Sequence, residues 1–393
     1  MKKDKKNIKL MSSTFYNEKE TKKSLNKFIK SAQILSMGKE TAQFEKEFSK
    51  KQKRKYAVYV NSGGSANLVL LQTLLNLGKI KKGAKIGVTA LTWGTNVMPI
   101  IQLGLIPIVI DVSLSTLNVS PEILKQNICN IDVFFTTNVL GFSDKMNEIK
   151  KICEKNKILF IEDNCEALGS MVGNKLLGNF GFASTFSFFV AHHISTIEGG
   201  MIVTDDEELY NALVMTRANG WDRNLQPDKQ KFLRKKEAID EFYSKYTFYD
   251  LAYNVRPTDI TAHIGRLQLK FWDKIVKTRE KNFNFFHKII LKNSKLMHFD
   301  LKHMTRISNF SIPIVAKDEE TCKYYKNLFA KQGVETRPII AGNIAHQPFY
   351  KKYVKNINKQ PNADLIHKNG FYFTNNPEIS IDDKNILKKL LKK

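Results

Sequence analysis

Short apolar runs and amphipathic stretches alternate through the first half of the chain. Runs rich in valine, isoleucine and aromatic residues span 56–60, 85–88, 106–111, 133–139 and 158–163. Runs of this length and composition are typical of buried strands. The segments between them include helix signals, such as Ser120 followed by Pro121, a cap and first-turn pair. The pattern predicts strands separated by helices.

Longer amphipathic stretches dominate the rest of the chain. We expect helices over 17–32, 40–52, 206–217, 258–292, 317–332, 361–369 and 381–392. Strands are expected at 201–204, at 308–315 and from Glu335 onward. Residues 1–17 are polar and are expected to be extended, and the polar segment 218–250 is expected to form loops and helices.

A glycine-rich turn follows the first predicted strand. Residues 61–67 read Asn-Ser-Gly-Gly-Ser-Ala-Asn and precede the apolar run 68–71. Glycines permit a tight turn between strand and helix, and the free N–H groups at a helix start can hold a phosphate. Many α/β proteins contain such turns, so this one alone indicates a candidate anion site and no particular reaction.

Composition excludes several classes of protein. The chain has 393 residues, of which 42% are hydrophobic, enough for one large and one smaller domain. Its net charge of +25 is mostly lysine. We attribute this charge to a lysine-rich bias over solvated helices, although a basic surface also attracts phosphates. No arginine-rich run, finger or helix-turn-helix signature indicates a nucleic-acid partner.

No motif indicates a metal centre, an export signal or a membrane span. The four cysteines fit no zinc or iron–sulfur spacing, and they are expected to be reduced thiols of a cytoplasmic protein. The basic start at 1–6 is not followed by the apolar region of a signal peptide. No apolar run is long enough to span a bilayer, so no membrane partner is expected.

The most informative stretch is 186–200, which reads Phe-Ser-Phe-Phe-Val-Ala-His-His-Ile-Ser-Thr-Ile-Glu-Gly-Gly. It resembles the cofactor-lysine segment of the DegT/DnrJ/EryC1/StrS family of sugar aminotransferases, roughly Ser-Phe-x-x-x-Lys followed by glycines and an acid. In that family the lysine binds pyridoxal phosphate (PLP) covalently. Here His192 occupies the lysine position, and 176–228 contains no lysine that could replace it. The resemblance covers roughly residues 12–390.

This resemblance implies a fold and an assembly. The expected fold is α/β, of the aspartate-aminotransferase type (PLP fold type I), with a mostly parallel sheet in a large α/β/α domain and a small α+β domain. We expect the N-terminal arm and large domain over 1–255, and the crossover helix and small domain over 256–393. The run at 253–256 resembles a family motif whose asparagine reaches the partner's cofactor phosphate. A homodimer with shared sites is therefore expected, and Asn254 takes that role.

The resemblance also assigns the cofactor's phosphate and ring to particular residues. Gly64 and Ser65, in the glycine-rich turn, and Ser187 correspond to phosphate ligands. Trp93, after the strand at 85–88, is expected to stack on the pyridine ring, because a flat π-face holds a flat cofactor.

The run Glu-Asp-Asn-Cys-Glu-Ala-Leu-Gly at 162–169 matches a strong family motif. Asp163 is expected to pair with the protonated ring nitrogen and so keep the ring an electron sink. Glu166 stands where many aminotransferases carry glutamine, and it is expected near the cofactor O3′ or the reacting sugar.

A second specific segment, 336–348, resembles the branch of the family formed by nucleotide-sugar 3-dehydratases. Arg337, Asn343 and His346 are its candidate substrate ligands, and His346 departs from the arginine of that pattern. Arg256, close to Asn254, is a further candidate, with a structural ion pair as its alternative role.

The Ala-His-His run at 191–193 is also similar to that branch, which implies its chemistry. L-Glutamate would convert PLP to pyridoxamine phosphate (PMP), whose amine would join the C4 ketone of a nucleotide-linked 4-keto-6-deoxy hexose or heptose. His192 would act as base and then acid, which suits its ordinary pKa near ~6.5. The C3 hydroxyl would leave, giving a 4-keto-3,6-dideoxy sugar for surface polysaccharide and free ammonia. His193 is expected to be a packed histidine, with orientation of His192 as its alternative role.

Other functions stay open at this point. The chain could be an aminotransferase that works without a covalent lysine link, a dehydrase that passes electrons to a reductase, a non-catalytic PLP-binding sensor, or a decayed aminotransferase. The reductase-dependent type carries an iron–sulfur cysteine cluster, which the sequence does not show.

Overall fold

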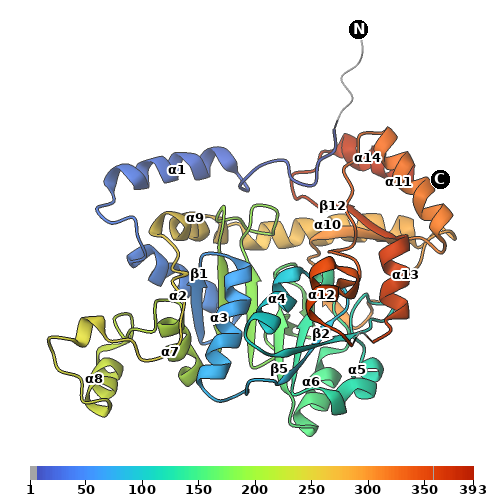
Figure 1. Ribbon diagram of the computed structural model, residues 1–393. Helices are drawn as coiled ribbons and strands as arrows, with labels where there is room; N and C mark the ends of the chain where they lie inside the picture. Colours follow the sequence, from blue (N-terminus) through green and yellow to red (C-terminus); the bar gives the residue numbers. More distant parts are fainter. Residues whose placement is uncertain (1–6, 357) are drawn as a thin grey trace.

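A seven-stranded sheet forms the centre of the computed structural model, which describes residues 7–356 and 358–393 (Figure 1). Its strand order is β1-β9-β8-β5-β4-β2-β3. The strands are β1 (Tyr56–Val60), β2 (Lys85–Thr89), β3 (Ile106–Ile110), β4 (Val133–Thr137), β5 (Leu159–Asp163), β8 (Ala183–Ser187) and β9 (Gly200–Thr204). Only β9 runs antiparallel to its neighbours, so the sheet is mostly parallel, as expected.

Helices cover this sheet because its central strands are apolar on both faces; every residue of β4 is buried. The helices of this part are α1 (Glu18–Ser31), α2 (Lys39–Gln52), α3 (Gly63–Asn76), α4 (Gly94–Gln102), α5 (Pro121–Asn127), α6 (Met146–Lys155), α7 (Glu207–Thr216) and α8 (Pro227–Lys236). The predicted cap at Ser120 is present, since its hydroxyl accepts from the N–H of Ile123. α8 projects away from the sheet in Figure 1.

The C-terminal part builds a second, smaller sheet with its own helices. β11 (Ser311–Val315) pairs antiparallel with β12 (Gly370–Thr374), a strand that the sequence pattern did not reveal. The remaining elements are α9 (Asp259–Leu269), α10 (Trp272–Ile290), β10 (Met304–Arg306), α11 (Glu319–Lys331), α12 (Pro348–Tyr353), α13 (Pro361–Asn369) and α14 (Ile381–Leu391). β10 pairs with the hairpin β6 (Met171–Val172) and β7 (Lys175–Leu176). We propose the division of the chain near residue 255 on this arrangement.

Two element predictions were wrong. The helix expected over 258–292 is two helices, because Lys270 and Phe271 bond three residues back instead of four and turn the chain. The strand expected from Glu335 is a single bridge between Arg337 and Tyr372. Pro338 follows at once and has no N–H to continue a ladder.

The N-terminal arm, residues 8–16, ties the two parts together. Ile8 bridges Val334, and Thr374 donates its hydroxyl to the carbonyl of Leu10, both in the C-terminal part. At the other end of the arm, Tyr16 exchanges two backbone hydrogen bonds of 3.0 Å with the side chain of Gln268. The arm therefore contacts both the smaller sheet and α9.

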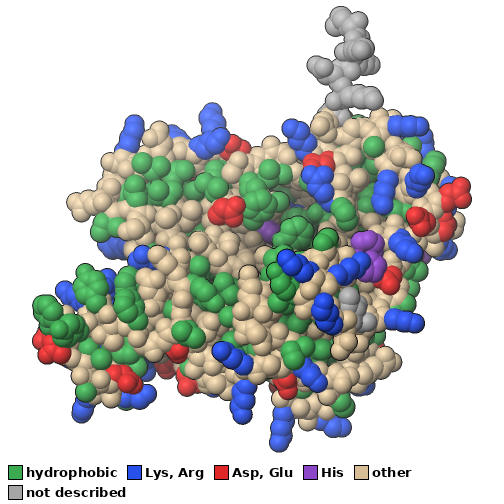
Figure 2. Space-filling view, viewed as in Figure 1, with side chains coloured by type: hydrophobic (Ala, Val, Ile, Leu, Met, Phe, Trp, Pro, Cys, Tyr) green, Lys and Arg blue, Asp and Glu red, His purple; other side chains and the backbone are tan. Residues whose placement is uncertain are grey.

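Lysine and arginine side chains are spread over the visible face of the molecule and do not gather into one patch (Figure 2). This distribution agrees with a general lysine bias as the main source of the positive charge. Among the described residues, no helix is both long and apolar enough to cross a membrane.

Candidate active site

Asp163 ends β5 as a buried carboxylate surrounded by neutral donors. One of its oxygens accepts from the side-chain amides of Asn96 (2.7 Å) and Asn67 (3.2 Å), and the other accepts from the N–H of Cys165 (2.8 Å). Only 4% of the residue is exposed. Within the described ranges no cation pairs with it. A buried carboxylate of this kind fits a cationic ring nitrogen as its missing partner.

The start of α3 forms a cradle beside β8. Ser62 caps the helix by accepting from the N–H of Ser65 (3.0 Å). A side chain at Gly63 would bring its Cβ within 2.6 Å of the Cβ of Ser187, so only glycine permits this close approach. The first N–H groups of α3 and the hydroxyl of Ser187 therefore meet at one point, with Gly64 beside them. This arrangement fits a phosphate.

Trp93 lies at the start of α4, after the end of β2, and is 59% exposed. A tryptophan that only packs would lose this surface to the core, so its ring is free to lie against a ligand. The neighbouring Leu91 bridges Asn343, and the N–H of Ile344 donates to the carbonyl of Ala90 (2.9 Å). The segment 343–346 from the smaller part is thus brought beside Trp93.

His192 lies in the loop between β8 and β9, between two aromatic rings. Its imidazole centroid is 5.3 Å from that of Phe310 and 6.3 Å from that of Phe189. Nδ1 is buried without a hydrogen-bond partner, so Nε2 is the nitrogen left to act on a ligand. Burial lowers the pKa of His192 to about 4, with a smaller contribution from the charge of Arg279. The imidazole is therefore neutral at pH 7 and able to accept a proton.

Glu166 is protonated at pH 7, whereas His192 is not. Its carboxyl accepts from the N–H of Leu140 (2.8 Å), and burial raises its pKa to about 8, helped by the nearby charge of Asp163. The group therefore holds its proton at pH 7 and can donate a hydrogen bond. A neutral base and a protonated acid in one site are the pair that proton-transfer chemistry needs.

His193 is buried beside His192 and bonds the carbonyl of Ser308 through Nε2 (2.8 Å). Burial, together with the charge of Arg279, lowers its pKa well below the usual value. It is a neutral packed neighbour, the role that the sequence suggested.

Asn254 and Arg256 are exposed and bond each other, with Nε of Arg256 donating to the Asn254 amide oxygen (3.0 Å). The carbonyl between them, that of Val255, accepts from the N–H of Asn61 (3.1 Å), next to the α3 cradle. The guanidinium of Arg256 also lies 5.2 Å from the ring centroid of Trp221. Arg256 has no carboxylate partner among the described residues.

The three candidates from 336–348 differ in how free their side chains are. Arg337 is exposed and pairs with Glu335. His346 is exposed and bonds Asp364 through Nε2 (2.9 Å). Asn343 is fully buried; its amide donates to Asp364 (2.7 Å) and Gln360 (3.3 Å), and its oxygen accepts from Ala345 (3.0 Å).

Asn343 is therefore a correction to the expected ligand set. Both its amide nitrogen and its amide oxygen are already bonded inside the protein, so it orders the segment beside Trp93 and has no atom left for a substrate. Arg337 and His346 remain proposed substrate ligands.

Sequence reasoning missed several residues that shape the site. Asn67 and Asn96 were inside quoted motifs, yet nothing in their spacing showed that both would bond Asp163. Tyr372 lies on β12; burial raises its pKa, and the negative charge of Glu166 makes a smaller contribution. Arg279 could have been found, because it continues the buried stripe of α10 formed by Ile275, Val276, Asn282, Phe283 and Phe286.

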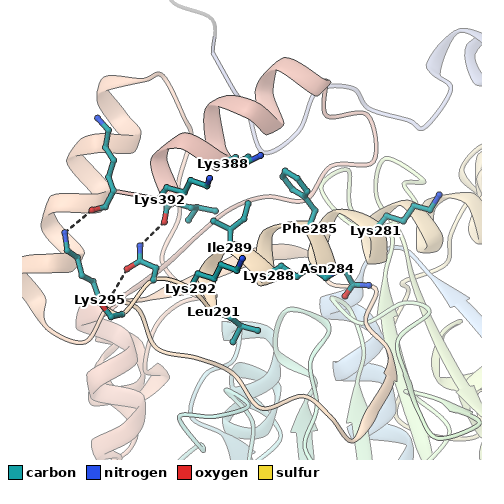
Figure 3. Close-up of a pocket in the computed structure, with 14 residues that line it drawn as sticks. Lys281, Asn284, Phe285, Lys288, Ile289, Leu291, Lys292, Lys295, Lys388 and Lys392 are labelled. Carbon is teal, nitrogen blue, oxygen red and sulfur yellow. Dashed lines mark hydrogen bonds between the residues drawn. The ribbon is translucent and has the colours of Figure 1, made fainter.

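A groove elsewhere on the molecule shares no residue with this site. It lies between α10 and α14, has a volume of about 1050 Å³ and is lined by lysines over an apolar floor (Figure 3). Its Asn293 already donates to Tyr325 and to the carbonyl of Leu391. Flexible, hydrated ammonium groups without a buried polar partner provide no reactive centre, so we assign the chemistry to the ends of β5 and β8.

Comparison with known proteins identifies the relatives of this chain. The model of the DegT/DnrJ/EryC1/StrS aminotransferase family matches residues 16–391. A GDP-4-keto-6-deoxy-D-mannose 3-dehydratase of Escherichia coli O55:H7 is 37% identical, with 92% of this chain and 94% of that protein covered. The enzyme of the same name from Yersinia pseudotuberculosis is 34% identical, with 98% of each covered.

Solved structures show the same relationship. The Escherichia coli GDP-4-keto-6-deoxy-D-mannose-3-dehydratase with bound hydrated PLP has a TM-score of 0.89 and 33% identity, covering 98% of this chain and 99% of that one. A structure of GDP-4-keto-6-deoxymannose-3-dehydratase with a trapped PLP-glutamate geminal diamine has a TM-score of 0.88 and 33% identity, covering 98% and 100%. The fold is thus of the expected PLP-enzyme type, and the chain belongs to the DegT/DnrJ/EryC1/StrS aminotransferase family.

Proposed function

We propose that this chain is a PLP/PMP-dependent 3-dehydratase of a nucleotide-linked 4-keto-6-deoxy sugar, with L-glutamate as co-substrate. Among such sugars we propose GDP-4-keto-6-deoxymannose, the substrate in the names of the two relatives above. The observation that carries the proposal is a neutral histidine at the family's lysine position, in the same chain as the α3 cradle and the buried carboxylate of Asp163 that fit the cofactor.

The residues divide the work of binding between them. Gly64, Ser65 and Ser187 would hold the phosphate at the start of α3, and Trp93 would lie against the ring. Asp163 would bond the ring nitrogen and keep it protonated. When bound, PMP supplies an amine for the sugar ketone and a ring that accepts electrons.

Proton movement falls to His192 and Glu166. Nε2 of His192 would take a proton from the cofactor's methylene carbon and return it to the departing C3 hydroxyl, which leaves as water. Glu166, protonated at pH 7, would donate a hydrogen bond within the site. The overall reaction balances: sugar and L-glutamate give the 3-deoxy sugar, 2-oxoglutarate and ammonia.

We also propose that the active unit is a homodimer in which Asn254 and Arg256 serve the partner's site. Large apolar side chains are exposed just before this segment, including Phe242 (82%), Tyr246 (72%) and Leu251 (70%). Exposed apolar side chains concentrated in one segment are typical of an interface. A partner that covers them would bring Asn254 close to a second cradle.

Incubation with GDP-4-keto-6-deoxymannose, PLP and L-glutamate tests the reaction. We expect the wild type to form ammonia and 2-oxoglutarate in equal amounts. His192→Asn should release no ammonia and at most one equivalent of 2-oxoglutarate per site, because asparagine cannot move a proton. An aminotransferase would instead form 2-oxoglutarate and retain the nitrogen in the sugar. A PLP-binding sensor or a decayed enzyme would form neither.

A further inference from the structure

Arg279 on α10 is a buried cation without a carboxylate partner. It is 5% exposed, and its terminal nitrogen donates to the carbonyls of Phe310 (2.7 Å), Asn375 (3.2 Å) and Asn309 (3.4 Å). Its Nε is enclosed and unbonded. Within the described residues no acid pairs with it. Buried arginines are ordinarily paired, so an unpaired one requires a reason.

The position of Arg279 suggests that reason. It shares a cavity of about 40 Å³ with His192 and His193. The backbone that it holds, residues 308–310, contacts both histidines: the ring of Phe310 lies against His192, and the carbonyl of Ser308 bonds His193. One guanidinium thus fixes the segment that supports both imidazoles.

The same segment extends to the acid of the site. The N–H of Phe310 donates to the carbonyl of Leu140 (2.9 Å), and the N–H of Leu140 donates to Glu166. Gly141 is pressed against this segment, since a Cβ there would lie 2.8 Å from the Cα of Asn309. Residues 308–310 therefore connect the base His192 with the acid Glu166. Arg279 bonds the carbonyls of Asn309 and Phe310 in this segment.

We propose that Arg279 is a positioning residue with two effects on His192: its hydrogen bonds fix the imidazole through residues 308–310, and its unpaired charge adds to the effect of burial in opposing protonation of that imidazole. The inference rests on the proposed role of His192 as the base. The charge of Arg279 acts on His192 because no carboxylate among the described residues is paired with it; a carboxylate partner would cancel that charge.

Other titratable groups around the cavity do not supply this effect. His193 is neutral, and the backbone of Tyr16, on the arm, is bonded to Gln268 at the edge of the cavity. Glu378, after β12, is exposed and accepts from the hydroxyl of Ser13 (2.7 Å) at the surface. Arg279 is thus the cation of this cavity that acts on His192.

Titration of His192 in the cofactor-free protein tests the charge effect directly. The chain has eight histidines, so ¹³C-labelled imidazole carbons can be followed by NMR, with the His192 signal assigned by its loss in His192→Asn. With a pKa of about 4, about a tenth of His192 is protonated at pH 5. We expect this fraction to rise to about a half in Arg279→Met.

Arg279→Lys separates charge from position. Lysine keeps the charge, but its shorter side chain does not place an N–H donor where the terminal guanidinium nitrogen bonds the three carbonyls. We expect His192 to titrate as in the wild type while kcat for dehydration falls at least tenfold. In Arg279→Met both the titration and kcat should change, and the acid limb of kcat/KM should move up by about one pH unit.

Arg306→Met is the matched control. Arg306 is also partly buried and donates to a carbonyl, that of Gly169 (2.7 Å), but it does not line this cavity. The Arg306→Met variant should leave the titration of His192 unchanged. The proposal is overturned if Arg279→Met, or Arg279→Gln should the methionine variant not fold, leaves that titration at its wild-type position. If the wild-type protein does not dehydrate the sugar, the proposed function is refuted, but the titration still tests whether Arg279 acts on His192.

Discussion

At the scale of single residues, the imidazole at position 192 determines which chemistry is open to the site. A lysine there would bind the cofactor covalently, whereas histidine has no amine to do so. The residues that the resemblance assigns to the cofactor are also present: the start of α3, the exposed Trp93 and the buried acid Asp163. We therefore expect the change of this one side chain to change the reaction without requiring a new cofactor site.

His192→Lys should restore a covalent link. The new amine would occupy the family's lysine position, so borohydride reduction in the presence of PLP should give an adduct at residue 192, detectable by peptide mass spectrometry. Dehydration should fall at least a hundredfold, because the amine competes for the cofactor and is a different base. A reduced adduct at any lysine of the wild-type site would contradict the proposed lysine-free mechanism.

Glu166→Gln should remove one limb of the pH profile. The carboxyl has a pKa of about 8, so its proton is present below that pH and lost above it. We expect wild-type kcat/KM to fall as the pH rises through about 8. Glutamine retains an N–H donor but cannot ionise, so the variant should keep activity within about threefold at pH 7 and lose this limb. An alkaline limb that stays near pH 8 would assign it to another group.

At the scale of elements, the start of α3 and the end of β8 depend on one close contact. Gly63→Ala should weaken PLP binding at least tenfold, because the added Cβ would push α3 away from Ser187 and widen the phosphate cradle. Fluorescence titration with PLP measures the effect. Gly94→Ala is the control, since its Cβ meets only the flexible end of Met98 (3.2 Å). Equal affinities of the two variants would show that the cradle tolerates the shift.

Elements that depend on local pattern could be predicted, and those that depend on distant partners could not. The strand at 159–163 and the glycine-rich turn carry their own signals. The break between α9 and α10 lies in a continuous amphipathic stretch, and Gln268 next to the break is held by Tyr16 from the arm, far away in sequence. β12 directly follows α13, and only its pairing with β11 makes it a strand.

The same distinction applies to the site. The motif around Asp163 and the segment around His192 were recognisable because each is contiguous. Arg279 was missed because the run Lys-Thr-Arg-Glu-Lys at 277–281 looks like a solvated helix face; only its helical spacing from the apolar residues Ile275 and Phe283 indicates the buried side. Asn343 was expected to meet substrate because its segment resembles the 3-dehydratase motif, and its buried partners Asp364 and Gln360 lie too far along the chain for the sequence to reveal them.

At the scale of the whole molecule, a shared site predicts complementation between inactive variants. Asn254→Ala should lose most activity if its amide serves the partner, and His192→Asn should lose it in its own subunit. Mixed dimers then contain one site with both changes and one with neither. We expect activity to return to roughly a quarter of the wild type after the two variants are unfolded and refolded together.

The control is the same mixture without refolding, in which each dimer keeps one kind of subunit. No recovery after refolding, with each variant shown to be folded and dimeric by light scattering, would mean that Asn254 acts within its own chain.

Because His192 has no amine to bind the cofactor covalently, the fraction of sites that hold cofactor depends on the free cofactor concentration. A cofactor held by hydrogen bonds and stacking alone leaves when it is diluted, so the loaded fraction follows the free PLP or PMP concentration. Such a ligand stabilises the folded chain by about 2.7 kcal/mol at a hundred times its Kd. The melting temperature should therefore rise steadily with added PLP and return to its starting value after dialysis, so the protein can exchange PLP for PMP with its surroundings between turnovers.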